Sequence, residues 1–165
     1  MKTAIVYATK YGSTKKAAEI IAEKLSNCTL IDIHALPESF DEYDCVILGS
    51  YVHMGVLQRD IRAFALGQIR LLLQKKLAIF VCCAFPENAK TYFNNNIPPQ
   101  LLKHASACEA LGGEIDRSRL KGMDRMVARM VLKADHAKGI LRTFSLHDDK
   151  IEAFVDKLTD GEATV

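Results

Sequence analysis

The sequence lacks the apolar segments that place proteins in membranes or in the secretory pathway. No apolar run approaches the length needed to span a bilayer, which takes about 20 residues. The Met-Lys start has no apolar signal-peptide region, because Tyr7, Lys10, Lys15 and Lys16 interrupt the first apolar run early. We therefore expect a cytoplasmic protein, and leave open a peripheral contact with the inner face of the cell membrane.

Patterns for metal sites and disulfide frameworks are also lacking. The five cysteines are odd in number, lie mostly in apolar, strand-like runs and include no Cys-x-x-Cys pair. The five histidines show no His-x-x-x-His spacing. We therefore expect no zinc or iron–sulfur site, and we expect reduced, buried thiols.

Length and composition are those of one ordinary globular domain. A chain of 165 residues can bury roughly 70% of its unfolded surface. Its hydrophobic fraction of 49% and charged fraction of 25% are typical of soluble proteins. Because internal repeats, low-complexity tracts and clear linkers are absent, we expect a single domain over residues 1–165.

The charge is distributed unevenly along this domain. Between Arg117 and Arg142 the chain has eight Lys and Arg residues against two Asp, a local balance of +6. Since the whole chain carries +2, the remainder carries −4. We interpret residues 117–142 as a basic helical insertion and expect an anionic partner there, but no nucleic acid. The oligomeric state stays open.

Alternating apolar and amphipathic segments predict an α/β fold. Strands are expected over residues 3–8, 28–33, 44–50, 77–85 and 107–115, and helices over 15–25, 58–73, 99–105, 120–134 and 148–158. Segments 51–57 and 86–96 are interpreted as loops, and 139–146 as holding another short strand. Such alternation favours a parallel sheet in the order 2-1-3-4-5 with helices on both faces. A ligand is then expected beyond the carboxyl ends of strands one and three.

The first fourteen residues carry the clearest functional pattern. An apolar strand leads into Thr9-Lys10-Tyr11-Gly12-Ser13-Thr14, which we call the opening loop, and a helix follows. Backbone N–H groups and the positive end of the helix dipole would meet there and hold an anion, most simply a phosphate. The alternative is a plain helix cap, although one cap needs neither three hydroxyls nor a glycine. The Gly-x-x-x-x-Gly-Lys-Ser/Thr pattern of a P-loop is absent.

Thr9-x-Tyr11-Gly12-x-Thr14 after an N-terminal strand resembles the FMN phosphate loop of flavodoxins, and the order of elements over the whole chain is similar. The resemblance implies a flavodoxin-like three-layer α/β/α sandwich with FMN as its cofactor. It implies phosphate contacts from the backbone amides of residues 10–14 and from the hydroxyls of Thr9, Ser13 and Thr14. Two further loops would then hold the isoalloxazine ring. The residues expected to contribute are Ser50, Tyr51, Val52, His53, Met54 and Gly55 in the first loop, and Cys83, Ala84, Phe85, Asn88 and Tyr92 in the second.

Two of these residues have simpler interpretations, and the second loop departs from the family pattern. His53 would otherwise be an exposed loop residue, and Cys83 a small buried apolar side chain. The second loop lacks the Gly-Asp pair and the acidic residues common in small electron-carrying flavodoxins.

The segment Gly49–Gly55, together with Met123-Asp124-Arg125-Met126-x-x-Arg129-Met130-x-x-Lys133, is similar to the bacterial flavodoxin-like protoporphyrinogen IX dehydrogenases. This resemblance implies an FMN-dependent oxidoreductase of heme biosynthesis that passes electrons to a respiratory quinone. Two alternatives stay open: a soluble flavodoxin that carries electrons, and a flavin-free regulatory module. No residue is singled out as a catalytic acid or base.

The basic helix has two interpretations of its own. One apolar stripe is predicted along it, made of Leu120, Met123, Met126, Val127, Met130, Val131 and Ala134. The stripe would pack on the domain, or the helix would dock on a membrane leaflet or on porphyrin propionates. Each basic side chain near an anionic bilayer contributes about 1 kcal/mol. Arg125 and Arg129 are therefore the candidate substrate or membrane contacts.

Overall fold

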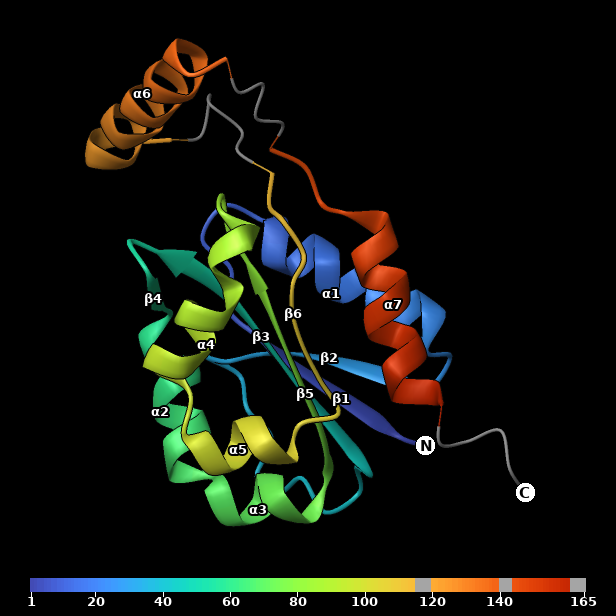
Figure 1. Ribbon diagram of the computed structural model, residues 1–165. Helices are drawn as coiled ribbons and strands as arrows, with labels where there is room; N and C mark the ends of the chain where they lie inside the picture. The colour runs from blue at the N-terminus through green and yellow to red at the C-terminus, as the bar shows by residue number, and fades with distance from the viewer. Residues whose placement is uncertain (115–119, 140–143, 161–165) are drawn as a thin grey trace.

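A parallel sheet forms the centre of the protein in the computed structural model, which describes residues 1–114, 120–139 and 144–160 (Figure 1). Its parallel strands are β1 (Thr3–Tyr7), β2 (Cys28–Asp32), β3 (Cys45–His53), β5 (Lys76–Cys82) and β6 (Ala107–Ala110). They are hydrogen bonded in the order β2-β1-β3-β5-β6, and the short β4 (Val56–Leu57) pairs antiparallel with β3 off this path. The predicted α/β fold and the order 2-1-3-4-5 of its parallel strands are confirmed.

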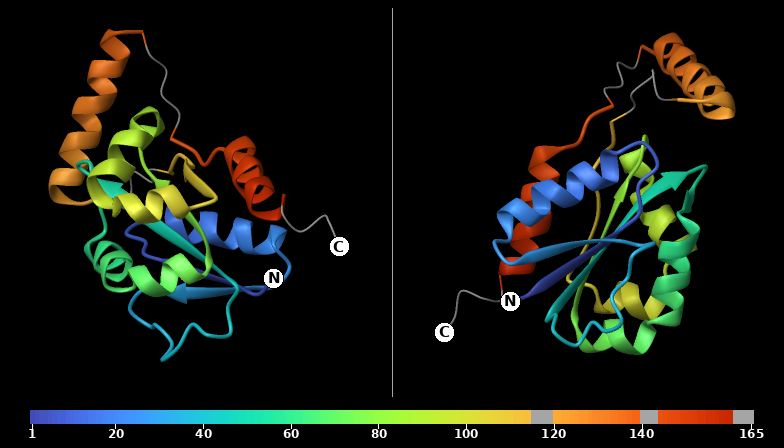
Figure 2. Two further views of the ribbon diagram at one scale, coloured as in Figure 1. Left: turned by 60° about the horizontal axis from the view of Figure 1, so that its bottom comes forward. Right: turned by 180° about the vertical axis from the view of Figure 1, so that it is seen from behind.

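Helices cover both faces of this sheet (Figures 1 and 2). The elements on one face are α1 (Ser13–Lys24) and α7 (Asp148–Thr159). Those on the other are α2 (Arg59–Gly67), α3 (Ile69–Gln74), α4 (Ala89–Asn96) and α5 (Pro99–His104), with the 3-10 turn η1 (Pro86–Asn88) before α4. The remaining helix, α6 (Gly122–Ala137), lies beyond the carboxyl ends of the strands.

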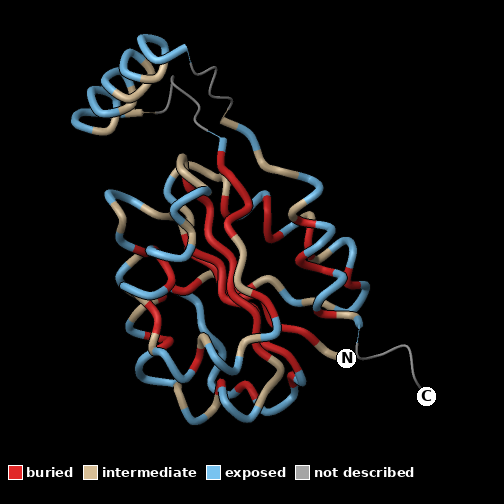
Figure 3. Tube along the Cα trace, in the orientation of Figure 1, coloured by how far each residue is buried: buried red, intermediate tan, exposed pale blue. Residues whose placement is uncertain are grey.

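The apolar strands are buried on both faces, as their sequences predict. In β1, Ala4 and Val6 join the core beneath α2–α5, while Ile5 and Tyr7 join the core beneath α1 and α7. Every residue of β1 is buried, and the buried chain follows the central strands (Figure 3). Successive side chains of a strand point to opposite faces of the sheet. Because helices cover both faces here, both sets of side chains are apolar and the strand sequence is a continuous apolar run.

The expected helix over 58–73 is two helices. α2 begins after Gln58, whose side chain accepts hydrogen bonds from the N–H groups of Asp60 and Ile61. It ends at Gly67, and Gln68 (φ −109°, ψ 24°) leaves helical geometry before α3 starts. Glycine has a low helix propensity, so the break between α2 and α3 occurs at the residue that favours a helix least.

Segments 51–57 and 86–96, expected as loops, are largely regular. β3 continues to His53 and turns into β4 through Met54 and Gly55, both with positive φ. Segment 86–96 forms η1 and α4, because buried Tyr92 and Phe93 pack this polar stretch on the core. Burial of two aromatic rings outweighs the weak helix propensity of the asparagines.

The last expected strand, over 107–115, is regular only to Ala110. Within the described residues its continuation forms one bridge, between Gly112 and Leu146, and residues 140–143 of the segment 139–146, in which a short strand was expected, lie outside the described residues. Beside it the Gly113 N–H donates to Ser145 O at 3.1 Å, and the His147 N–H donates to Leu111 O at 2.9 Å. The chain thus leaves the sheet for α6 and returns at the same place. Residues 115, 117–119 and 140–142 of the predicted strand and insertion lie outside the described residues.

Candidate functional site

The opening loop connects β1 to α1 through a tight turn. The Thr9 hydroxyl oxygen accepts a hydrogen bond from the Gly12 N–H at 3.0 Å. Gly12 has φ 103°, a left-handed conformation that residues with a Cβ rarely adopt. Gly12 precedes α1 without any side-chain capping bond, so the plain helix cap is not what these hydroxyls form.

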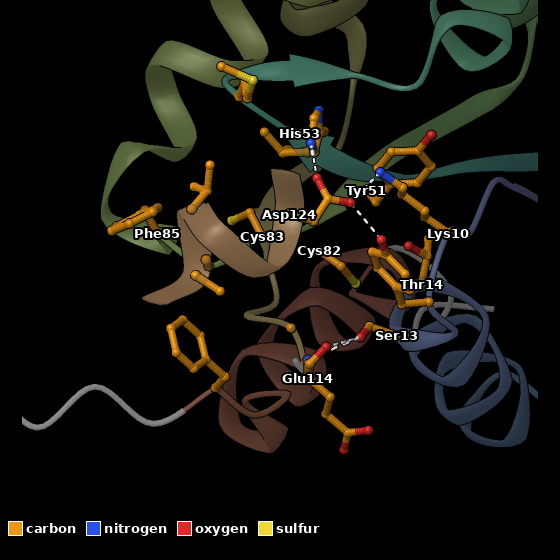
Figure 4. A pocket seen from close by; sticks show the side chains of 18 of the residues that line it. Lys10, Ser13, Thr14, Tyr51, His53, Cys82, Cys83, Phe85, Glu114 and Asp124 are labelled. Atoms are coloured by element: carbon orange, nitrogen blue, oxygen red, sulfur yellow. Dashed lines mark hydrogen bonds and ion pairs between the residues drawn. The ribbon is translucent and has the colours of Figure 1, made fainter. Parts of the chain in front are cut away.

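The three hydroxyls of this loop have different surroundings. Thr9 is paired as described, and the Ser13 hydroxyl donates to Glu114 O at 2.8 Å and accepts from Glu114 N at 3.1 Å (Figure 4). The Thr14 hydroxyl is buried, and among the described residues no hydrogen-bond partner satisfies it. The Cys82 thiol beside it is a weak hydrogen-bonding group, and burial raises the pKa of that thiol. Of the three hydroxyls, that of Thr14 is therefore the buried one that a ligand would satisfy.

The β3–β4 hairpin forms a second side of the site. Two consecutive residues with positive φ, Met54 and Gly55, make the tight turn that such hairpins require. Ser50 is fully buried at the base of the hairpin, where its hydroxyl donates to Tyr51 O and accepts from Gln58 N. Ser50 therefore supports the hairpin from below.

The segment after β5 forms a third side. Cys83 is buried, and burial raises the pKa of its thiol to about 11, which agrees with a small apolar side chain. Asn96 in α4 ties this side to the hairpin: its side-chain amide donates to Gly55 O at 3.1 Å and to Tyr92 O at 2.8 Å, and accepts from Leu57 N at 3.1 Å.

These three sides and α6 enclose a pocket of about 330 Å³, a volume suited to a small ligand or cofactor. Fourteen of the residues expected from the sequence line it. They are Thr9, Lys10, Tyr11, Ser13, Thr14, Tyr51, Val52, His53, Met54, Gly55, Cys83, Ala84, Phe85 and Tyr92. Gly12, Ser50 and Asn88 are not among the lining residues; Asn88 ends the 3-10 turn η1.

Sequence reasoning missed Cys82 and the part of the lining that comes from the far end of the chain. The residues from the far end are Gly113, Glu114, Leu120, Asp124, Val127, Ala128, Val131 and Phe144. The helical spacing from Leu120 to Val131 was a usable signal for an apolar face. Asp124 had another, since it is one of two acidic residues in a basic segment.

Asp124 joins the opening loop to the hairpin. Its Oδ2 lies 2.6 Å from Lys10 Nζ and 2.5 Å from the Tyr11 hydroxyl, and its Oδ1 lies 2.6 Å from His53 Nε2 (Figure 4). The hydrogen bond from Lys10, followed by that from Tyr11, holds the pKa of Asp124 well below its usual range. The same bonds raise the pKa values of Lys10 and Tyr11. His53 is thus a paired residue of the pocket rim.

The apolar residues of α6 divide into two faces. Val127, Val131 and their neighbours line the pocket, whereas Met123, Met126 and Met130 are 64%, 56% and 64% exposed. The single stripe packed on the domain is therefore a wrong expectation, because the helix lies over a cavity and has no buried residue. Arg125 and Arg129 are exposed on the outside of the helix and do not line the pocket. Among the described helices, none is both long and apolar enough to pass through a bilayer.

The arrangement can hold a ligand with one polar and one apolar end. The polar end would meet the start of α1 and the unpaired Thr14 hydroxyl. The apolar end would meet the side chains of the hairpin, of Phe85 and of α6.

Comparison with known proteins places this geometry in a family. A family model described as a flavodoxin domain matches residues 4–139. No curated protein matches the sequence significantly.

Solved structures resemble the chain at low identity. The flavodiiron core of Flv1 from Synechocystis sp. PCC6803 has a TM-score of 0.51 at 20% identity, over 67% of this chain and 30% of that one. A flavodoxin, WrbA-like protein, from Agrobacterium tumefaciens has a TM-score of 0.50 at 20% identity, over 79% and 91%. A flavoprotein from Lactobacillus acidophilus, solved in complex with FMN, has a TM-score of 0.50 at 18% identity, over 66% and 89%. This chain therefore spans less than a third of the flavodiiron core, and these likenesses concern the fold.

Proposed function

Since this chain belongs to the flavodoxin domain family, we propose that it binds FMN in the pocket beneath α6 and acts as an FMN-dependent oxidoreductase. The observation that carries the proposal is the Thr14 hydroxyl, which is buried at the start of α1 and has only the weak Cys82 thiol beside it among the described residues. An unpaired buried hydroxyl is costly, and a phosphate oxygen would satisfy it. The FMN found in the Lactobacillus acidophilus flavoprotein is in keeping with this ligand.

Different residues of the pocket would contact the phosphate and the ring system of FMN. Thr14 and the first amides of α1 would hold the phosphate, where the helix dipole favours negative charge. Tyr51, Val52 and Phe85 would pack on the ring system, and Cys83 would fill space beside it. The flavin would supply the redox chemistry, and the chain would orient it and exclude water.

The position of α6 favours an enzyme over a soluble electron carrier. A carrier exchanges electrons in brief encounters, for which an uncovered ring edge is suited, whereas α6 contributes a wall of this pocket. Its exposed methionines and its row of Arg125, Arg129 and Lys133 suit an apolar substrate that carries negative charge. We therefore propose a quinone-linked protoporphyrinogen dehydrogenase activity, with α6 as a peripheral contact to anionic membrane.

Absorbance of the purified protein tests the cofactor. We expect a yellow protein, or a colourless one that binds added FMN with quenching of flavin fluorescence. A colourless preparation that FMN cannot reconstitute would rule out both the enzyme and the electron carrier, and would leave the flavin-free module.

An anaerobic assay with protoporphyrinogen and a menaquinone analogue tests the reaction. We expect turnover that depends on both substrates and on bound FMN. A yellow protein without turnover in this assay would point to the electron carrier.

Sedimentation with vesicles that contain phosphatidylglycerol tests the membrane contact. The double variant Arg125→Glu, Arg129→Glu should lose binding at low salt. The matched control, Lys90→Glu with Lys103→Glu, changes two exposed cations of α4 and α5 and should keep it. Equal binding by both variants would reject a membrane role for α6.

A further inference from the structure

The three donors around Asp124 do more than a surface ion pair does. No residue of α6 is buried. The Asp124 side chain is nevertheless only 16% exposed, less than the 38% of its partner Lys10. The Lys15–Glu19 pair of α1, by contrast, has both side chains about half exposed and contributes little. The Asp124 carboxylate is sheltered and brings together three donors, of which Lys10 and His53 are 38% and 46% exposed.

The chemistry of the cluster fixes the direction of each bond. An ionised carboxylate only accepts hydrogen bonds, so Lys10 Nζ, the Tyr11 hydroxyl and His53 Nε2 all donate to Asp124. Bonds to a charged acceptor are about twice as strong as neutral ones. Lys10 is therefore directed to α6, which leaves hydroxyls and backbone amides of the opening loop for an anion there.

Among the described residues, the cluster joins α6 to both the opening loop and the hairpin through polar contacts. An isolated helix of this length, 16 residues, is marginal in water, so its stability depends on docking. Its inner face offers the pocket only a few apolar side chains, Val127, Ala128 and Val131. A ligand that enters or leaves on the α6 side has to separate α6 from the opening loop or from the hairpin. That separation breaks bonds to Asp124.

We infer that Asp124 is a positioning residue that closes α6 over the pocket, and that opening of its cluster with Lys10, Tyr11 and His53 sets the rate at which a ligand is exchanged. The closure follows from the contacts alone. Its effect on FMN exchange rests on the proposed function.

Hydrogen exchange of the full chain without added flavin tests the closure. In Asp124→Asn the amides of α6 should exchange at least tenfold faster than in the unchanged protein, and those of β3 and β5 at the same rate. The matched control is Lys133→Gln, which removes an exposed charge from the same helix outside the pocket lining and should leave α6 protection within about twofold. Equal α6 protection in Asp124→Asn and the unchanged protein would overturn the inference.

A second variant and a second readout keep this test decisive. If Asp124→Asn does not fold, Lys10→Met with Tyr11→Phe removes two of the donors and should raise α6 exchange in the same way. With FMN bound, Asp124→Asn should release it at least tenfold faster while the unfolding midpoint of the flavin-free protein changes little. Unchanged release together with faster α6 exchange would overturn the link to ligand exchange. If FMN does not bind at all, the proposed function fails and the exchange measurement still decides the closure.

Discussion

Replacing Thr14 by Val is expected to stabilise the protein in the absence of FMN. The two side chains have nearly the same shape, so the change removes the hydroxyl without opening a cavity. That hydroxyl is 1% exposed by residue and has no partner among the described residues. An unpaired buried polar group costs about 1–3 kcal/mol in proteins. Because the Cys82 thiol offers weak compensation, we expect a gain of about 1–2 kcal/mol in the free energy of unfolding.

The same substitution is expected to weaken FMN binding. A hydrogen bond to a charged group contributes about 1.5–3 kcal/mol, which corresponds to a loss of roughly 10- to 100-fold in affinity. Urea unfolding of the flavin-free protein measures the first effect, and a fluorescence titration with FMN measures the second. In a chain of this size the gain should appear as a rise of about 2–8 °C in Tm.

Thr9→Val is the matched control, because its hydroxyl is paired where that of Thr14 is not. The Thr9 oxygen accepts from the Gly12 N–H at 3.0 Å, so its removal should lower the free energy of unfolding by about 0.5–1.5 kcal/mol. Opposite signs for the two valine variants support the reasoning. A Thr14→Val protein that is less stable than the original without FMN would refute it.

Three further predictions concern packing, thiol reactivity and pH. In Gly49→Ala the new Cβ would lie 2.7 Å from Cε1 of the buried Phe80 ring, so urea unfolding should show a loss of about 1–3 kcal/mol; unchanged stability would contradict this packing. Because burial raises the pKa of Cys83 to about 11, its thiol should react with a disulfide reagent at pH 8 much more slowly than in guanidinium, and equal rates would contradict its burial. The hydrogen bond from Lys10 lowers the pKa of Asp124, so its stabilising effect is fully present above about pH 4 and is lost at lower pH. The difference in α6 hydrogen exchange between the original and Asp124→Asn should therefore shrink on acidification, and a constant ratio of the two exchange rates at pH 6 and pH 3 would contradict the pairing.

The central sheet could be predicted because the apolar character of its residues indicates burial on both faces. Strand β1 is apolar at every position from Ala4 to Tyr7, and only a strand covered on both faces needs such a run. The opening loop was equally readable, since Gly12 marks a turn and the surrounding hydroxyls mark polar chemistry. These features depend on local sequence and on one general topology.

The parts that escaped prediction depend on contacts between distant segments. Met54 adopts φ 50° although methionine gives no turn signal, because hairpin pairing imposes that conformation. The polar stretch of α4 is helical because Tyr92 and Phe93 find a core to pack on. The role of Asp124 needs Lys10, more than a hundred positions earlier in the chain, and no local pattern carries that information.

The segment that carries α6 begins and ends at neighbouring positions of the fold, so it could be exchanged as a unit. Residues 113 and 145 are joined by a backbone hydrogen bond, so the ends of this segment are already held together. The entropic cost of a loop grows only slowly with its length, and α7 would stay in place for a shorter or a longer insert. Replacing the segment between these residues by a short turn would leave the sheet and its helices intact and the pocket open on one side. One scaffold could in this way acquire different ligand preferences through changes in a single segment.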